Sequence, residues 1–269
     1  MTPPPGPSTP RRHYAGFEVL EFAEIDSTNS EALRRAAAGE RGPLWLRADQ
    51  QRAGRGRLGR AWGSQTGNLL ATLLTEVSCP PQAASQLSLL AGVAAMEAIG
   101  AVAGDRLAPG RLRLKWPNDV LLNGDKIAGI LAESVIAGDD RRLLVALGTG
   151  INLASHPEDL GRPVTNLSVM GVSSTPQHML EALMTATASW LTRWRHGENF
   201  AEVRKAWLGY GPRSGDPIAI NTGAALRNGA FAGLDDTGAL LIRDADGQEL
   251  TFNFGDVADP LLNSRAAKT

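Results

Sequence analysis

Residues 112–131 decide the fold, and they read LRLKWPNDVLLNGDKIAGIL. Asn123 and Gly124 stand between two apolar runs, and this pair is a strong signal for a tight β-hairpin because both residues tolerate the positive φ angles of its turn. The hairpin pairs a strand at Asp119–Leu122 with a second strand at Lys126–Val135. The sheet is therefore expected to contain at least one antiparallel pair.

The same stretch groups polar side chains. Pro117 keeps the residue before it extended and forces a bend, so Lys115, Asn118 and Asp119 are expected close together at one strand end. The hairpin partner brings Lys126 within reach of them. A lysine that begins an apolar strand is by itself more often a strand-edge residue than a catalytic one, so its role depends on the rest of the chain.

The remaining elements are predicted from hydrophobic periodicity and from helix and turn signals. Strands alternate with few crossover helices, which favours an α+β fold over a doubly wound one. We expect a mixed, mostly antiparallel sheet with helices packed on one face. Besides the hairpin, the predicted strands are Phe17–Phe22, Leu44–Ala48, Leu69–Thr75 and Leu143–Leu147, and the helices are Thr28–Ala38 (with a capping box formed by Thr28 and Glu31), Gln82–Val102, Pro176–Arg195 and Phe200–Trp207.

Three regions divide the chain. Residues 1–15 are rich in proline and are expected to form a disordered tail. Residues 16–212 are expected to hold the large α+β domain, and residues 213–265 a small all-β barrel of roughly 50 residues, a size at which a domain usually leans on a neighbour. The predicted strands of the barrel are Pro217–Asn221, Ala224–Leu226, Ala230–Leu234, Leu240–Arg243 and Leu250–Phe254.

The composition excludes several classes of protein. The formal net charge is −1, whereas a protein that coats nucleic acid needs a substantial basic excess. Cys79 is the only cysteine and the four histidines are scattered, so we expect neither a disulfide nor a transition-metal site. No apolar run approaches the roughly 18 residues of a membrane span, and no signal peptide is evident. We expect a cytoplasmic protein that binds no membrane.

A second stretch, residues 54–60, reads GRGRLGR and satisfies the pattern G-x-G-x-x-G. A dinucleotide-binding turn would need a helix to open at these glycines, and the residues that follow, AWGSQTG, cannot form one. A kinase glycine-rich loop would need H-R-D and D-F-G segments downstream, and the sequence has neither. The remaining interpretations are a solvated basic loop and a loop that orders over an anion, since arginines can fork onto phosphate or carboxylate oxygens.

Two more polar groups stand at strand ends. Ser27–Asn29 lie at a strand-to-helix junction, where they can cap the helix or form the floor of a polar ligand site. Gly148–Asn152 end a buried strand, and the glycines there let the backbone come near a ligand. Cations and backbone amides without a pair of catalytic acids suit phosphoryl or nucleotidyl transfer, which depends mainly on positioning and charge stabilisation.

Together these motifs resemble those of the biotin protein ligases. Residues 54–62 (GRGRLGRAW) are similar to the signature loop of that family, residues 115–119 (KWPND) to its second motif, and residues 126–131 (KIAGIL) to its third. The STN and GTGIN segments described above fit as well. The resemblance covers about residues 17–259, and it implies a catalytic domain like that of class II aminoacyl-tRNA synthetases followed by an SH3-like β-barrel.

The resemblance implies a two-step reaction. The carboxylate of biotin attacks the α-phosphate of ATP, which gives biotinyl-5′-AMP and releases pyrophosphate, with Mg²⁺ bridging the phosphates. A lysine of an acceptor protein then attacks the mixed anhydride and releases AMP. The expected acceptor is the apo biotin carboxyl carrier domain of an acyl-CoA carboxylase.

The resemblance also assigns residues to each role. The biotin site that it implies consists of Ser27, Thr28, Asn29, Gln51, Arg55, Gly56, Arg57 and Lys126. The nucleotide site consists of Arg55, Arg57, Arg60, Trp62, Asn118, Lys126 and Asn152. The implied catalytic residues are Lys126, Arg55, Arg57, Lys115 and Asp119, and Asp119 is also the candidate for contact with Mg²⁺.

Alternatives remain in two classes. A lipoate or octanoate ligase of the related fold uses similar lysine-dependent chemistry, although the arginine loop and the KWPND turn favour biotin. A nucleic-acid-binding module could use the arginine loop, but no stacking aromatics interleave with its arginines. Some family members carry a helix-turn-helix domain and repress transcription, and the residues ahead of Phe17 cannot hold a recognition helix. We therefore expect no nucleic-acid partner, and a monomer or weak homodimer.

Overall fold

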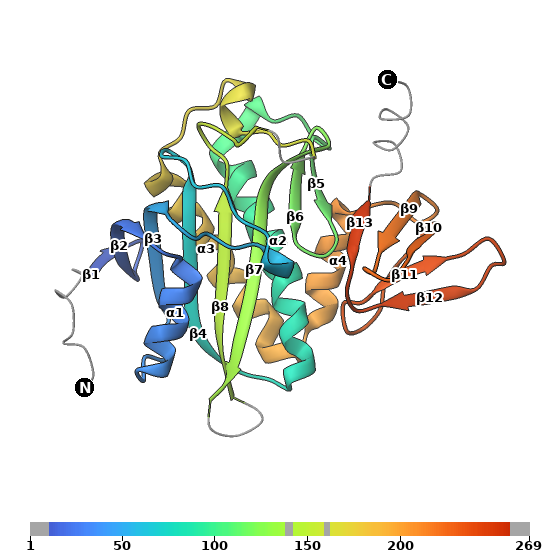
Figure 1. Ribbon diagram of the computed structural model, residues 1–269, viewed down its shortest axis with the longest axis horizontal. Coiled ribbons are helices and arrows are strands. Elements are labelled where there is room, and N and C mark those ends of the chain that lie inside the picture. Colours follow the sequence, from blue (N-terminus) through green and yellow to red (C-terminus); the bar gives the residue numbers. More distant parts are fainter. Residues whose placement is uncertain (1–10, 138–141, 159–161, 259–269) are drawn as a thin grey trace.

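The computed structural model describes residues 11–137, 142–158 and 162–258, and its centre is an eight-stranded sheet (Figure 1). The strands follow the order β1-β2-β3-β4-β8-β7-β6-β5, and every neighbouring pair is antiparallel except β2 and β3. The predicted α+β class is therefore confirmed. The bounds are β1 Arg11–Tyr14, β2 Phe17–Ile25, β3 Leu44–Gln51, β4 Leu69–Ser78, β5 Leu112–Lys115, β6 Asp119–Leu122, β7 Asp125–Ile136 and β8 Arg142–Ile151.

Helices cover both faces of this sheet, although the sequence led us to expect them on one. In Figure 1, α1 lies on the side of the sheet opposite to α2, α3 and α4. Successive strand residues point to opposite faces. In β4, accordingly, Leu73 joins the core under α2, while Leu74 packs with Ala32 and Ala36 of α1. The helix bounds are α1 Thr28–Ala37, α2 Gln86–Ala103, α3 Pro176–Trp194 and α4 Phe200–Tyr210.

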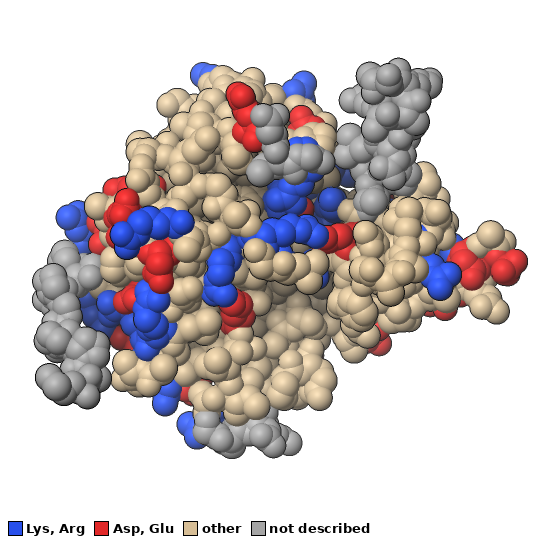
Figure 2. Space-filling view, viewed as in Figure 1, with Lys and Arg blue, Asp and Glu red and all other residues tan. Residues whose placement is uncertain are grey.

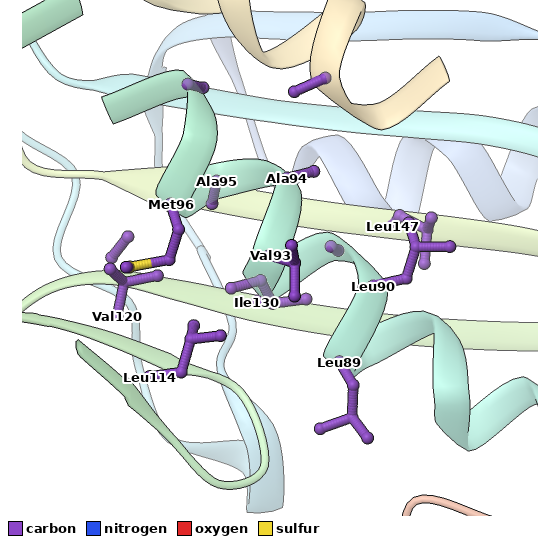
Figure 3. Packing of buried hydrophobic residues seen from close by; sticks show 14 of the residues in the cluster. Leu89, Leu90, Val93, Ala94, Ala95, Met96, Leu114, Val120, Ile130 and Leu147 are labelled. Carbon is purple, nitrogen blue, oxygen red and sulfur yellow. The ribbon is translucent and has the colours of Figure 1, made fainter. Parts of the chain in front are cut away.

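The central core helix is α2. Figure 3 shows its side chains, among them Val93 and Met96, packed in one cluster with Val120 and Ile130 of the sheet. Its other side meets α3 and α4. The expectation that no apolar stretch approaches the length of a membrane span needs correction, because Pro81–Arg106 is long and apolar enough by composition. Of its apolar window, 67% is buried inside the fold. Packing on two sides accounts for this hydropathy.

The predicted hairpin is confirmed. β6 and β7 pair in antiparallel fashion, and the turn between them gives Asn123 a φ of 55° and Gly124 a φ of 93°. Both angles are positive, as the Asn-Gly pair requires. The KWPND turn joins the end of β5 to the start of β6, and the hairpin places Asp119 opposite Gly129 of β7.

A second, five-stranded antiparallel sheet follows α4, in the order β12-β11-β10-β9-β13. Its Ile218, Phe231 and Val257 join the main core cluster, and the Trp116 indole donates a hydrogen bond to the Gly238 carbonyl at 3.1 Å. The small sheet therefore packs against the domain that contains the large one. Its bounds are β9 Pro217–Asn221, β10 Leu226–Leu234, β11 Leu240–Arg243, β12 Glu249–Phe252 and β13 Asp256–Ala258.

Three sequence predictions need correction. A separate strand at Ala224–Leu226 is wrong, because only Leu226 is in a strand, where it begins a longer one that pairs with β9. The strand β13 was not predicted. The tail expected at residues 1–15 is wrong over Arg11–Tyr14, which form β1 and pair with β2, while residues 1–10 lie outside the described part. Alternating side chains in these short segments are too few to give a clear period.

Candidate active site

A narrow cavity opens on the face of the sheet that carries α1, under the arginine loop. Figure 1 shows this loop crossing in front of β8 and β7, and Figure 2 shows Lys and Arg side chains gathered over the same region. All the predicted site residues except Lys115 and Asn152 line the cavity, namely Ser27, Thr28, Asn29, Gln51, Arg55, Gly56, Arg57, Arg60, Trp62, Asn118, Asp119 and Lys126. Segments distant in sequence thus meet at one place.

The start of α1 forms a polar wall of the cavity. The predicted cap at Thr28 is wrong, since Ser27 is the N-cap and its side chain accepts a hydrogen bond from the Ser30 amide. Thr28 is then free to donate from both its amide and its hydroxyl to the Gln51 side-chain oxygen, at 2.7 and 3.0 Å. Hydroxyl and amide groups fixed in this way match the NH and C=O groups of a small polar ring.

Asn29 is held underneath this wall. Its side-chain amide donates to the Leu131 carbonyl at 3.1 Å and to Glu133 at 2.9 Å, while its oxygen accepts a hydrogen bond from Thr72 at 2.7 Å. All these bonds go to the sheet. Asn29 therefore anchors α1 on the sheet as well as lining the cavity.

Glycines on two strands leave room above the backbone of the sheet for other groups to pack closely against it. A Cβ atom on Gly148 would lie 2.2 Å from the Asn29 oxygen, and one on Gly150 would lie 2.5 Å from the Trp62 ring. A Cβ on Gly129 would lie 2.8 Å from the same ring. Two strands thus use glycine where Asn29 and Trp62 lie directly on the backbone.

A β-bulge aims Lys126 into the cavity. The register of β6 and β7 places Val120 opposite Ala128 and then shifts, so Ile127 is an extra residue in β7. Ile127 and Ala128 both point into the core under α2. In a regular strand Lys126 would share the face of Ala128, and the bulge turns it to the opposite face.

The ammonium group of Lys126 contacts the Asp119 carboxylate, and both residues are buried. Burial lowers the pKa of Lys126 to about 8, and the Asp119 charge opposes this shift while Arg162 and Lys115 add to it. The ammonium nitrogen also lies 5.4 Å from the centroid of the Trp62 ring. A cation at the bottom of a partly enclosed cavity exerts a stronger field than one in water.

The arginine loop has a defined shape and defined partners. Arg57–Gly59 form a single 3₁₀ turn, in which Leu58 has a φ of 57° and is largely exposed. Arg55 pairs with Glu133 at 3.1 Å, Arg57 donates to the Asn118 side chain at 3.4 Å, and Arg60 pairs with Asp256 of the C-terminal sheet. Each of the three guanidinium groups is therefore held at the cavity by an oxygen of the protein.

Two predicted residues lie elsewhere. Lys115 lines a neighbouring cavity of about 440 Å³ between the two sheets, which shares Asp119, Lys126 and Arg162 with the first. Asn152 is buried and donates to the Thr165 carbonyl at 3.0 Å, so it ties the segment after β8 to the sheet.

Sequence reasoning missed four residues of this region. Thr72 and Glu133 hold Asn29 and Arg55, and Arg162 and Asp256 line the cavity. Thr72 and Glu133 carry a weak signal, because each interrupts an apolar strand with a polar side chain. Arg162 and Asp256 belong to none of the recognised motifs.

The protein alone offers little for a metal ion. Among the residues that the structure describes, no group of three or more His, Cys, Asp or Glu side chains is placed to hold one. Within the described ranges, Asp119 is the one acidic side chain that lines both cavities, beside Lys126. This fits Mg²⁺ that arrives on a nucleotide, since such ions use one or two carboxylates and take their other ligands from phosphates and water.

Comparisons with known proteins identify the family of this chain. The family model described as "Biotin/lipoate A/B protein ligase family" matches residues 21–152, and "Biotin protein ligase C terminal domain" matches residues 214–258. The chain is 42% identical to a biotin–[acetyl-CoA-carboxylase] ligase of Paracoccus denitrificans over 236 residues, which make up 85% of this chain and 95% of that protein. It is 32% identical to a ligase of the same description from Mycobacterium tuberculosis over 250 residues, 90% of each chain.

A solved structure gives the same result. The biotin protein ligase of Aquifex aeolicus in complex with biotin and ATP has a TM-score of 0.72 to this chain at 26% identity, and the match covers 89% of this chain and 97% of the other. Sequence identity over almost the full length of two curated ligases, both family models and this shared fold lead to one conclusion. The chain belongs to the biotin protein ligase family.

Proposed function

We propose that this chain is an ATP-dependent biotin protein ligase that makes biotinyl-5′-AMP and transfers biotin to a lysine of an acyl-CoA carboxylase. One observation carries the proposal. The buried Lys126–Asp119 pair lies where a polar pocket, an arginine loop and a second cavity meet. A carboxylate and a phosphate must come together in the first step, and this junction supplies the positive charge that they need.

The polar wall is our candidate for the biotin head group. Ser27, Thr28 and Gln51 present hydroxyl and amide groups to the cavity, and a ureido ring offers both donors and acceptors to such groups. The biotin tail would then run toward Lys126. Trp62, which lies over the glycines of the sheet, would cover the tail and keep water from the adenylate.

The cations around Lys126 would stabilise the adenylation step. A carboxylate oxygen of biotin forms a bond to the α-phosphorus, and the bond from that phosphorus to the pyrophosphate oxygen breaks. Lys126 would contact the carboxylate and α-phosphate oxygens, and Arg55 and Arg57 would exchange their present partners for phosphate oxygens. Asp119 would help to hold Mg²⁺ that arrives with the nucleotide, and such an ion would supply positive charge for the leaving pyrophosphate.

Two further predicted residues are assigned to the nucleotide and to the pyrophosphate that leaves it. Asn118 lines the cavity beside Arg57, and Lys115 lines the neighbouring one, where we place the departing pyrophosphate. In the second step the neutral amine of the acceptor lysine attacks the anhydride carbonyl and loses a proton to water, and AMP leaves with the electron pair of the broken C–O bond. We propose that the acceptor is an apo biotin carboxyl carrier domain, and that the enzyme is a cytoplasmic monomer or weak homodimer with no nucleic-acid partner.

The test is pyrophosphate release from Mg·ATP as biotin is added to the wild-type protein. Release that depends on biotin, followed by labelling of an apo carrier domain, is the expected result. Release with lipoate or octanoate but not with biotin would assign the protein to the related ligases. A protein that releases pyrophosphate with none of the three acids would not be a ligase of this kind.

The pH dependence of this reaction should report on Lys126. Its pKa of about 8 means that the amine loses its proton as the pH rises through that value, and the cation that the transition state needs is then lost. We expect kcat/KM for adenylation to fall by about tenfold for each pH unit above 8. Lys126→Arg stays charged over the same range, so its lower activity should lack this decline. The same decline in both proteins would assign the titration to another group.

A further inference from the structure

The C-terminal sheet touches the arginine loop through one acidic residue. We propose that Asp256 is a positioning residue that anchors Arg60 and thereby holds the arginine loop ready for the nucleotide. The inference rests on the proposed function, because it concerns the loop that would bind ATP. It differs from that function in giving Arg60 a partner within the protein, rather than the nucleotide contact that the resemblance implies.

Three contacts define the anchor. The Arg60 guanidinium contacts one Asp256 oxygen directly. Arg57 lies 3.8 Å from the other oxygen and donates to the neighbouring Gly255 carbonyl at 3.3 Å. Two cations of the loop therefore share one carboxylate, and a network of this kind is worth more than an isolated surface pair.

The backbone carries the effect of Arg60 to the other arginines. The Arg60 carbonyl accepts a hydrogen bond from the Gly56 amide at 2.7 Å, and Arg55 forms a β-bridge with Ala61. Arg60 thus closes the base of a small turn that contains Arg57. Three glycines make this segment costly to order, so a contact that fixes its base also limits where Arg55 and Arg57 can lie.

Asp256 itself is firmly placed. It pairs with Asn221 in the β13–β9 ladder, and the next residue, Val257, is buried in the main core. At Gly255 a Cβ atom would come within 2.7 Å of Ile220. The anchor therefore stands on a packed strand, and the loop is the more adaptable partner.

The geometry indicates that Arg57 and Arg60 respond differently when a phosphate binds. Arg57 is the more buried of the two and lies beside Asn118 deeper in the cavity, at a longer distance from Asp256. A phosphate that enters the cavity can take Arg57 from its weak partners. Arg60 is half exposed and in direct contact with Asp256, and a carboxylate repels phosphate, so this pair is the one that stays.

The experiment compares Asp256→Asn with Asp256→Glu in the full chain. Asparagine removes the charge and keeps the size, and glutamate keeps the charge. Asp236→Asn is the matched control, because Asp236 pairs with Arg204 of α4 across the same boundary between the sheets but does not line the cavity. The readouts are amide hydrogen exchange of residues 54–62 in the ligand-free protein, and KM for ATP and kcat in the pyrophosphate-release assay.

For Asp256→Asn we expect faster exchange in the loop and a rise of about three- to tenfold in KM for ATP, with kcat within about twofold of wild type. Asp256→Glu should recover most of both values, and Asp236→Asn should change neither. Unchanged loop exchange in Asp256→Asn would overturn the proposal, and so would an equal effect in Asp236→Asn or a fall in kcat alone. Wild-type protein that releases no pyrophosphate would refute the ligase function instead, and loop exchange would still decide whether Asp256 is the anchor.

Discussion

Lys126→Ala is expected to lower biotin-dependent pyrophosphate release by about 100- to 1,000-fold, the usual cost of removing one group that stabilises charge in a transition state. Lys126 is the most buried of the described cations that line the cavity, and the bulge at Ile127 gives it a direction that a neighbouring side chain cannot take over. The loss should fall mainly on kcat. Single-turnover formation of the adenylate is the measurement.

A control must separate lost chemistry from lost stability. Lys126→Ala leaves the buried Asp119 carboxylate without its direct partner, with the Arg162 guanidinium 3.9 Å from its other oxygen, and a buried charge that loses its partner destabilises a protein strongly. Lys126→Ala combined with Asp119→Asn removes both charges and should recover thermal stability but not activity. Near wild-type adenylation by Lys126→Ala would show that the buried pair is structural.

Local signals in the sequence were enough for much of the fold. The Asn123-Gly124 turn, the strand before it and the helix at Pro176 all appear as predicted, because each is fixed by neighbours in sequence. The second helical layer was not predicted. α1 packs on its own face through Ala32 and Ala36, and small residues of this kind give no sign of which face of a sheet they will cover.

The candidate site, like the fold, could be predicted only in part. Motif residues could be named from the sequence, but their mutual geometry depends on strand register. The bulge that turns Lys126 toward Asp119 arises from a one-residue shift that no local pattern marks. Glu133 and Asp256 come near the arginine loop only because β7 passes beside it and β13 begins beside it. They lie 78 and 196 residues along the chain from their arginine partners.

The glycines of β8 are the other place where a small change should have a large effect. Gly148→Ala would put a methyl group 2.2 Å from the Asn29 side-chain oxygen, and Asn29 cannot move aside because it is bonded to Thr72, Leu131 and Glu133. We expect a loss of about 1–3 kcal/mol in the free energy of unfolding, as for other overpacked cores. Biotin affinity should fall by at least about tenfold, since α1 carries the polar wall.

Calorimetric titration with biotin and thermal unfolding measure the two effects, and the chain offers a matched control. Gly100 lies in α2, and apart from its own stretch of helix no atom of the described residues lies within 4 Å of a Cβ added there. Gly100→Ala should therefore stabilise the protein by about 0.5–1 kcal/mol through helix propensity and leave biotin affinity unchanged. Gly148→Ala that binds biotin as wild type does would mean that Asn29 and the start of α1 do not shape the biotin pocket. Because the two substitutions add the same methyl group, opposite signs would assign the effect to the contact with Asn29.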